Sequence, residues 1–188
     1  LGGNHDIGVL CPRLRNTEGG RIANSSRLWS LVRRLGLLPD LPEPRGDLHF
    51  CDIAQGAAML IRADVFAELG GFNEAFFMYG EEIEYSVRVR QQGYEVAVHD
   101  GVEVEHTNPI QLVLQNEAYK TYYDTRNRFL LGTLRFSGAS RVLYTVLALG
   151  TVVIHALKYL RVGDVATFKT QLFGVWDAFN GRYGRYRY

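Results

Sequence analysis

The sequence contains little sulfur and little proline: its 188 residues include two cysteines, two methionines and five prolines. Cys11 and Cys51 form no CxxC pair, so the sequence indicates neither a thiolate metal site nor a disulfide framework. We therefore expect two buried, reduced thiols, as in proteins of a reducing cytoplasm.

Several common catalytic signatures are also missing. The sequence has no GxxxxGK(S/T) phosphate loop, no GxGxxG fingerprint, no HExxH and no GxSxG. Each of these patterns carries a specific phosphate-binding, metal-binding or nucleophilic role. Their absence argues against the commonest nucleotide hydrolases, dehydrogenases, zinc proteases and serine hydrolases.

No long hydrophobic run is present. The longest uncharged stretch of the C-terminal part, Val142–Leu157, has 16 residues, whereas a membrane-spanning helix needs about 20. We predict a helix that lies on a membrane surface or packs against its neighbours. The tail 182–188 alternates arginine and tyrosine, which favours a membrane-interface anchor or a frayed terminus over a nucleic-acid partner.

The residues that are present suit a folded domain with an uneven charge. Apolar residues make up 47% of the chain and charged residues 22%, so a core can form and disorder throughout is excluded. Residues 64–106 carry a net charge of −8, and residues 107–188 carry +7. This division favours a cation near the middle and an anionic partner, such as a membrane surface, near the C-terminus.

The hydrophobic pattern predicts an α/β region over 1–110 and a helical, basic extension over 111–188. Alternating apolar residues predict strands over 7–10, 50–61, 94–98 and 102–106, the last two joined by a turn. Helical spacing predicts helices over 27–38, 65–69, 81–92, 111–134, 140–160 and 164–179. Asp64 is the expected N-cap of the short second helix, and Gly70 and Gly71 are expected to end it.

A carboxylate pair opens the helix predicted over 81–92. Glu81 and Glu82 follow Met78-Tyr79-Gly80, where a glycine and aromatic rings leave room for a sugar. A carboxylate there can accept a hydroxyl proton. Acidic residues in a first turn also stabilise the helix dipole, so a structural role stays open. Adjacent helical residues diverge by about 100°, so only one of the two faces a reacting centre.

Two further positions are candidates for binding. His106 ends a strand-like run near acidic residues and could ligate a divalent cation, although a lone histidine is often just a hydrogen-bonded residue. Arg126 and Arg128 could bind diphosphate or lipid-phosphate oxygens through paired hydrogen bonds, or could simply form a solvated helix face.

Taken together, these residues resemble family 2 glycosyltransferases, in particular the bacterial rhamnosyltransferase-like branch. The resemblance rests on 56–62 (GAAMLIR), Phe66, 70–72 (GGF), 76–82 (FFMYGEE), Glu84, Arg88 and 93–94 (GY). It extends from Ile7 to Arg126-Asn127 in consistent order and covers about two-thirds of the chain.

The resemblance implies an inverting enzyme of the GT-A fold that uses a nucleotide-diphosphate sugar, a saccharide or lipid-linked acceptor and a divalent cation, Mg²⁺ or Mn²⁺. The family's glutamate–aspartate pair falls on Glu81 and Glu82, and Glu82 inherits the role of general base. Glutamate replaces the usual aspartate, so the assignment between the two stays open.

By the same resemblance, six other positions are expected to contact substrate or metal. Tyr79 and Gly80 fall where the family contacts the acceptor sugar, Gln55 and Gly56 fall where a loop approaches the donor, and Arg126 is a further substrate-binding candidate. His106 falls on a histidine that helps to hold the metal.

The family's nucleotide-binding half and its aspartate-rich metal motif have no counterpart in the 188 residues and are expected upstream of Leu1. The chain is therefore expected to be the acceptor-side part of an enzyme of cell-surface polysaccharide synthesis, inactive alone. We expect a cytoplasmic location, with peripheral attachment to the inner face of the cell membrane left open. A non-catalytic carbohydrate- or lipid-binding scaffold, or a membrane-associated structural subunit, are the alternatives.

Overall fold

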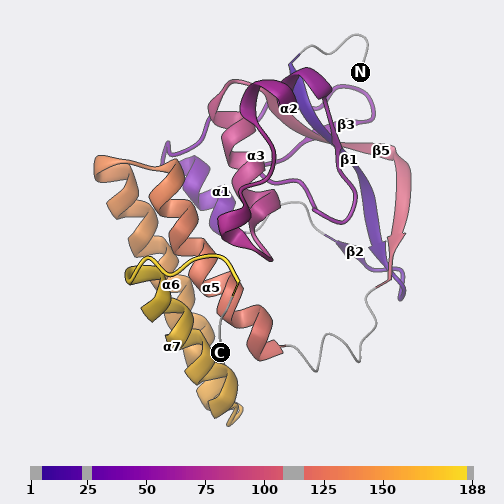
Figure 1. Ribbon diagram of the computed structural model, residues 1–188. Coiled ribbons are helices and arrows are strands. Elements are labelled where there is room, and N and C mark those ends of the chain that lie inside the picture. The colour runs from indigo at the N-terminus through magenta and orange to yellow at the C-terminus, as the bar shows by residue number, and fades with distance from the viewer. Residues whose placement is uncertain (1–5, 23–26, 108–116, 186–188) are drawn as a thin grey trace. The chain divides into compact units, whose positions relative to one another are not determined.

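The computed structural model describes residues 6–22, 27–107 and 117–185, and Figure 1 shows its ribbon. The chain divides into two compact units, which are described separately. Unit 1 comprises Leu1–Phe72 and Glu82–Asn108, and unit 2 comprises Asn73–Glu81 and Pro109–Tyr188. The loop 73–81 thus belongs to the helical unit, although it is inserted between two segments of the sheet unit.

Unit 1 is built on a mixed sheet of five strands in the order β2-β1-β5-β3, with β4 paired to β1. The central pair is parallel: β1 (Ile7–Asn16) lies beside β5 (Glu95–His106). Two short strands, β2 (Arg21–Ile22) and β4 (Leu60–Ile61), pair antiparallel with β1, and β3 (Leu48–Phe50) pairs antiparallel with β5.

Three helices belong to this sheet unit: α1 (Arg27–Arg34), α2 (Ala63–Leu69) and α3 (Glu81–Gln91), whose first residue falls on the other side of the division. The core forms where the apolar side of the sheet meets α2 and α3. Its main cluster consists of Val9, Cys11, Cys51, Ala54, Val65, Tyr85, Val89, Val96 and Val98. Both cysteines are free and buried, which confirms the expectation of two buried thiols.

The hairpin predicted for 94–106 is wrong. Both halves belong to the single strand β5 and pair in parallel with β1, from Ile7↔Glu95 to Asn16↔His106. The pairing steps from Pro12↔His99 to Arg13↔Glu103, so β5 carries three extra residues at this point. Asp100 lies in this bulge, and its carboxylate forms an ion pair with Arg13 at a nitrogen–oxygen distance of 2.6 Å. The turn-like residues 99–101 therefore form a bulge.

Four other boundaries differ from the expectation. The strand predicted over 50–61 is interrupted by a loop between β3 and β4, and the first strand runs on past Pro12 to Asn16. The first helix ends at Arg34, four residues early. Arg62, with extended backbone, occupies the N-cap of α2 in place of Asp64, whose carboxylate pairs with the Arg62 side chain.

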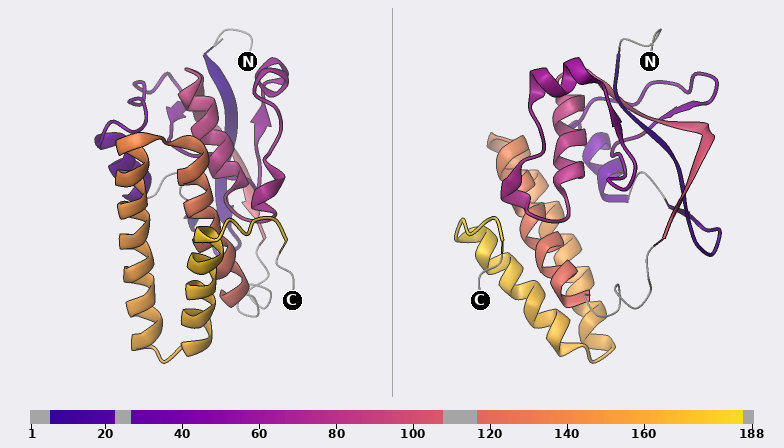
Figure 2. Two further views of the ribbon diagram at one scale, coloured as in Figure 1. Left: turned by 60° about the vertical axis from the view of Figure 1, so that its left-hand side comes forward. Right: turned by 45° about the vertical axis from the view of Figure 1, so that its right-hand side comes forward.

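Unit 2 contains the short helix η1 (Glu74–Phe76) and three long helices, α5 (Glu117–Arg135), α6 (Gly138–Arg161) and α7 (Val165–Phe179). The long helices confirm the predicted helical extension, although residues 111–116 of the first predicted helix lie outside the described residues. Asp164 caps α7 through the Thr167 amide at 3.0 Å. Figure 2 shows α6 and α7 as antiparallel neighbours.

Two glycines allow the helices of unit 2 to pack closely. A Cβ at Gly174 of α7 would lie 2.7 Å from the Tyr122 carbonyl oxygen of α5, and a Cβ at Gly132 would lie 2.7 Å from the Tyr144 ring of α6. The phenol of Tyr122 donates a 2.7 Å hydrogen bond to Asp177, which fixes α7 against α5. The α/β class with a helical C-terminal part is confirmed.

Candidate active site

Glu82 lies beside the backbone of Gly56 in unit 1. A Cβ at Gly56 would come within 3.3 Å of both Cβ and Cγ of Glu82. This is tighter than ordinary van der Waals contact, so a side chain at position 56 would require the glutamate to shift by a few tenths of an ångström. The structure therefore brings together two of the predicted site residues that lie 26 positions apart in the sequence.

Ser86 holds this arrangement. Its hydroxyl donates to the Glu82 carbonyl at 2.7 Å, one helical turn back, and accepts from the Ala54 amide at 3.0 Å. One buried side chain thus ties the first turn of α3 to the loop that carries Gln55 and Gly56. The loop turns there through a hydrogen bond from the Ala58 amide to the Gln55 carbonyl.

The turn is open to solvent. Gly56 is exposed, and Gln55 and Glu82 are half-buried. Glu82 is therefore positioned on a helix, in contact with a glycine turn and reachable from outside. This is the geometry that a general base for an external hydroxyl needs.

A buried ion cluster anchors the other end of α3 and its neighbouring loop. Arg90 donates to Asp52 at 2.7 Å, and Arg33 of α1 donates to the same carboxylate oxygen at 3.2 Å. Arg90 also donates to the Pro39 carbonyl. Asp52 and Arg90 are almost completely buried. Asp52 lies three positions before Gln55 in the sequence, so the cluster fixes the loop that reaches Glu82.

Glu84 and Arg88, four residues apart on α3, form an ion pair with a nitrogen–oxygen distance of 2.9 Å. Arg88 also donates to the carbonyls of Leu69 and Gly71, at 2.6 and 2.8 Å. Gly70 lies between them with φ 78°, a backbone conformation that favours glycine. The GGF segment is therefore held to α3 by one arginine.

The loop 73–81 of unit 2, called the aromatic loop below, has an unusual backbone. Phe77 and Tyr79 have positive φ angles of 60° and 61°, and Gly80 has φ 91°. A bulky residue in this region is strained and persists only where the surroundings hold it in place.

Asn127 of α5 supplies the restraint. Its side-chain amide donates to the carbonyls of Phe76, Met78 and Tyr79, at 2.9, 2.8 and 2.6 Å. Its Cβ lies 3.6 Å from the position that a Cβ on Gly80 would take. The sequence did not identify Asn127 as a site residue. An asparagine within a helix gives no sign that its side chain will bind Tyr79, which lies 48 positions earlier.

Arg126 also holds the aromatic loop in place. It is buried, and its guanidinium donates to the carbonyls of Phe76 and Gly184 at 3.0 and 2.6 Å and to the Asn127 side chain. The alternative of a solvated helix face is wrong for Arg126. These bonds give it a structural role in the loop, and its role as a substrate ligand stays a prediction.

The aromatic loop also presents accessible rings. Phe77 and Met78 are exposed, while Tyr79 is half-buried beneath Lys120, whose ammonium lies 6.0 Å from the ring centroid. One carboxylate oxygen of Glu81, Oε2, is enclosed and has no hydrogen-bond partner among the described residues. Glu81 can therefore still accept a donor.

The proposed metal ligand stands at the end of β5. His106 is half-buried and is paired in register with Asn16 of β1. Among residues 6–22, 27–107 and 117–185, no three histidine, cysteine, aspartate or glutamate side chains form a group that could hold a metal. The described residues therefore do not by themselves fit a cation site, and the metal-binding role of His106 stays a prediction.

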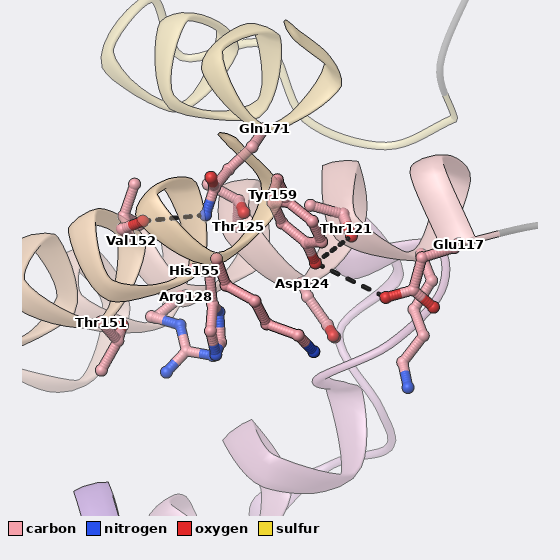
Figure 3. Close-up of a pocket in the computed structure, with 12 residues that line it drawn as sticks. Glu117, Thr121, Asp124, Thr125, Arg128, Thr151, Val152, His155, Tyr159 and Gln171 are labelled. Carbon is pink, nitrogen blue, oxygen red and sulfur yellow. Dashed lines mark hydrogen bonds between the residues drawn. The ribbon is translucent and has the colours of Figure 1, made fainter. Parts of the chain in front are cut away.

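Unit 2 contains a polar cavity of about 190 Å³ between its three long helices, shown in Figure 3. Ionisable side chains from α5 and α6 line it: Glu117, Lys120, Asp124, Arg128, His155 and Lys158. Burial raises the pKa of the Asp124 carboxyl and lowers the pKa of the His155 imidazole, because both lose hydration of the charged form. Gln171 donates to the Val152 carbonyl at 3.2 Å beside them.

No protein-family model matches the chain. Over 182 residues, 94% of its length, the chain is 33% identical to the low-salt glycan biosynthesis hexosyltransferase Agl10 of Haloferax volcanii. The chain spans 58% of the length of that relative.

Proposed function

We propose that the chain is part of a glycosyltransferase that moves a sugar from a nucleotide-diphosphate donor to a saccharide or lipid-linked acceptor. The hexosyltransferase relative and the sequence resemblance both support sugar transfer. The observation that carries the assignment of chemistry to residues is the contact between Gly56 and Glu82, at 3.3 Å for a Cβ added to the glycine.

Glu82 is the proposed general base. The acceptor hydroxyl oxygen attacks the anomeric carbon of the donor, its proton passes to the Glu82 carboxylate, and the bond from the anomeric carbon to the diphosphate oxygen breaks. Attack on the face opposite the leaving group inverts the anomeric configuration. Ser86 and Gly56 support this role because they fix the first turn of α3 beside an open turn.

The other assignments rest on the resemblance. Gln55 and Gly56 approach the donor sugar, Tyr79 and Gly80 contact the acceptor, and Arg126 is a further substrate-binding residue. Rhamnose is the proposed sugar. His106 would supply one imidazole ligand to a divalent cation, whose role when bound is to stabilise negative charge on the diphosphate. The described residues alone do not complete such a site, and no step above depends on it.

The test is the variant Glu82→Gln in the full-length protein. Glutamine keeps the size of the side chain and removes the base, so turnover should fall by about two to four orders of magnitude. Donor affinity, measured by calorimetry with the nucleotide sugar, should stay within a factor of about three. Near-normal turnover of Glu82→Gln would refute the base assignment.

Two further variants sharpen the assignment. Gly56→Ala should reduce turnover because the new methyl group presses on Glu82, whereas Gly150→Ala, with no atom within 4 Å of its added Cβ, serves as the control. His106→Ala should raise the cation concentration needed for half-maximal activity. An unchanged cation titration would exclude His106 from the metal site.

If the full-length protein binds the acceptor but transfers no sugar from any nucleotide-sugar donor, the non-catalytic scaffold is the correct reading and the proposed activity is wrong.

A further inference from the structure

The helix α6 presents an apolar face that none of the described residues of unit 2 covers. Only 22% of its most apolar 18-residue window is buried. A narrow strip, Tyr144, Ala148, Val152 and Tyr159, is buried. The remaining surface exposes large apolar side chains: Val142, Leu143, Val146, Leu149, Val153, Ile154, Leu157 and Leu160. A soluble core helix would show the opposite balance.

The neighbouring helix α7 repeats this feature. Its buried residues are largely small or polar, whereas Leu172, Phe173, Trp176 and Phe179 are exposed. The two helices are antiparallel neighbours (Figure 2), and both carry exposed apolar side chains. An exposed apolar surface of this kind marks an interaction site.

The charges on these helices identify the partner. Helix α6 contains no acidic residue and three cations, Arg141, Lys158 and Arg161, placed at its two ends. The one carboxylate of α7, Asp177, is buried and bonded to Tyr122. An apolar face bordered by cations matches an anionic lipid surface, where hydrocarbon accepts the apolar residues and headgroups attract the cations.

Length and composition alone would allow α6 to cross a bilayer. Its packing argues against this. His155 and Lys158 of α6 line the polar cavity together with Asp124 and Arg128 of α5 (Figure 3). A crossing α6 would carry these ionisable groups, and the helix that packs against it, into hydrocarbon, where charged side chains are strongly disfavoured.

We propose that the α6–α7 hairpin docks on an anionic membrane surface, with both helices lying in the interfacial plane and their apolar faces in the outer part of the acyl region. The surface consists of the exposed apolar side chains of α6 between Val142 and Leu160 and of α7 between Leu172 and Phe179, with Arg141 and Arg161 at its margins. This docking is independent of the proposed sugar transfer.

The test uses the 188-residue chain and vesicles of phosphatidylcholine with or without phosphatidylglycerol. The chain should float with the anionic vesicles and bind pure phosphatidylcholine at least about tenfold more weakly, and binding should fall with added salt. Arg161→Gln should lower the partition coefficient on anionic vesicles about fivefold.

An apolar variant tests the face itself. Ile154 is 66% exposed, so Ile154→Asp should leave the helical circular dichroism unchanged but lower the partition coefficient at least about tenfold. The matched control is Leu60→Asp in unit 1, at a position that is 57% exposed and outside the proposed surface. It should bind vesicles like the unchanged chain.

Trp176 reports the depth. It is 61% exposed, whereas the other tryptophan, Trp29, is 5% exposed and gives a constant background. On binding, its emission should shift to shorter wavelength and be quenched most by lipids brominated near the headgroup. Strongest quenching by lipids brominated near the chain ends would overturn the interfacial geometry.

Two other results would refute the proposal. One is an absence of vesicle binding together with a concentration-dependent dimer that Ile154→Asp disperses, because the face would then belong to a second copy. The other is vesicle binding that Ile154→Asp leaves unchanged, because the apolar face would then not be the contact.

Discussion

Unit 1 and unit 2 distribute charged and apolar side chains in opposite ways. In unit 1 the interior is apolar, and its buried charges are paired with each other, as in Asp52–Arg90 and Glu84–Arg88. Unit 2 also buries apolar side chains such as Phe129 and Leu131, but part of the space between its helices is a polar cavity lined by ionisable groups, and large apolar side chains cover the outer faces of α6 and α7.

The difference shows what surroundings each unit requires. A water-soluble domain gains most by burying apolar area, at roughly 25 cal/mol per Å², and unit 1 follows this rule. Unit 2 leaves apolar surface exposed on the neighbouring helices α6 and α7. This exposed surface is stabilised where another apolar medium or molecule covers it. Unit 1 therefore supplies the proposed base, and unit 2 the aromatic loop and the proposed membrane surface.

The largest expected effect concerns the buried charges of unit 1. Arg90→Met removes one of the two arginines that donate to the buried carboxylate of Asp52, so the free energy of unfolding of unit 1 should fall by about 3–5 kcal/mol. Urea unfolding followed by Trp29 fluorescence in a Trp176→Phe background measures this. The control Arg34→Met, at an exposed position of α1, should change it by less than about 0.5 kcal/mol. Equal effects of Arg90→Met and Arg34→Met would show that the buried Asp52–Arg90 pair does not stabilise unit 1.

A second prediction concerns the loop of unit 2. Asn127→Ala removes the amide that donates to three carbonyls of a strained loop, so unit 2 should lose about 1–3 kcal/mol of unfolding free energy. Chymotrypsin cleavage after Phe77 should become faster. The control Asn180→Ala, an exposed residue at the end of α7, should not change that cleavage. An unchanged cleavage rate in Asn127→Ala would show that the loop keeps its conformation without the Asn127 side chain.

A third prediction compares the packed and open sides of the long helices. Gly174→Ala should destabilise unit 2 by about 1–3 kcal/mol, because the added Cβ would lie 2.7 Å from the Tyr122 carbonyl oxygen. Gly150→Ala on α6 meets nothing within 4 Å and should stabilise it by about 0.5–1 kcal/mol. Thermal unfolding followed by circular dichroism distinguishes the two. Stabilisation by both would contradict the described packing of α7 on α5.

The smallest effect concerns the thiols of unit 1. Burial raises the pKa of Cys11 to about 11 and that of Cys51 to about 12, so both stay protonated in the folded chain at pH 8. Each should react with a thiol reagent only after unfolding. Because the folded pKa lies above the unfolded one near 9, this contribution to stability is complete below pH 9 and is lost as the pH rises toward 11–12. Rapid labelling at pH 8 would contradict their burial.

Local patterns predicted much of this fold. Glycine and apolar spacing placed α2, α3 and the long helices because they depend on neighbours within one or two turns. The same reasoning mistook residues 99–101 for a turn, because a bulge against β1 depends on a strand some 90 positions away. Asp64 was expected to cap α2, but it is the second residue of the helix, and its carboxylate pairs with Arg62, which takes the N-cap position.

The candidate site was likewise predicted only in part from the sequence. Sequence patterns identified Glu82 and Gly56, but only the fold shows that they touch. Asn127, Ser86 and Asp52 were missed as determinants of the site, since each acts through a partner far along the chain. Arg126 was chosen for its charge, whereas the fold places that charge on backbone carbonyls.

The most direct test of the proposed chemistry is the ratio of sugar-transfer rates of Glu82→Gln and Glu81→Gln in the full-length enzyme, measured under saturating donor and acceptor. We predict that Glu82→Gln is slower than Glu81→Gln by at least about two orders of magnitude. Equal rates, or a slower Glu81→Gln, would contradict the assignment of the base to Glu82.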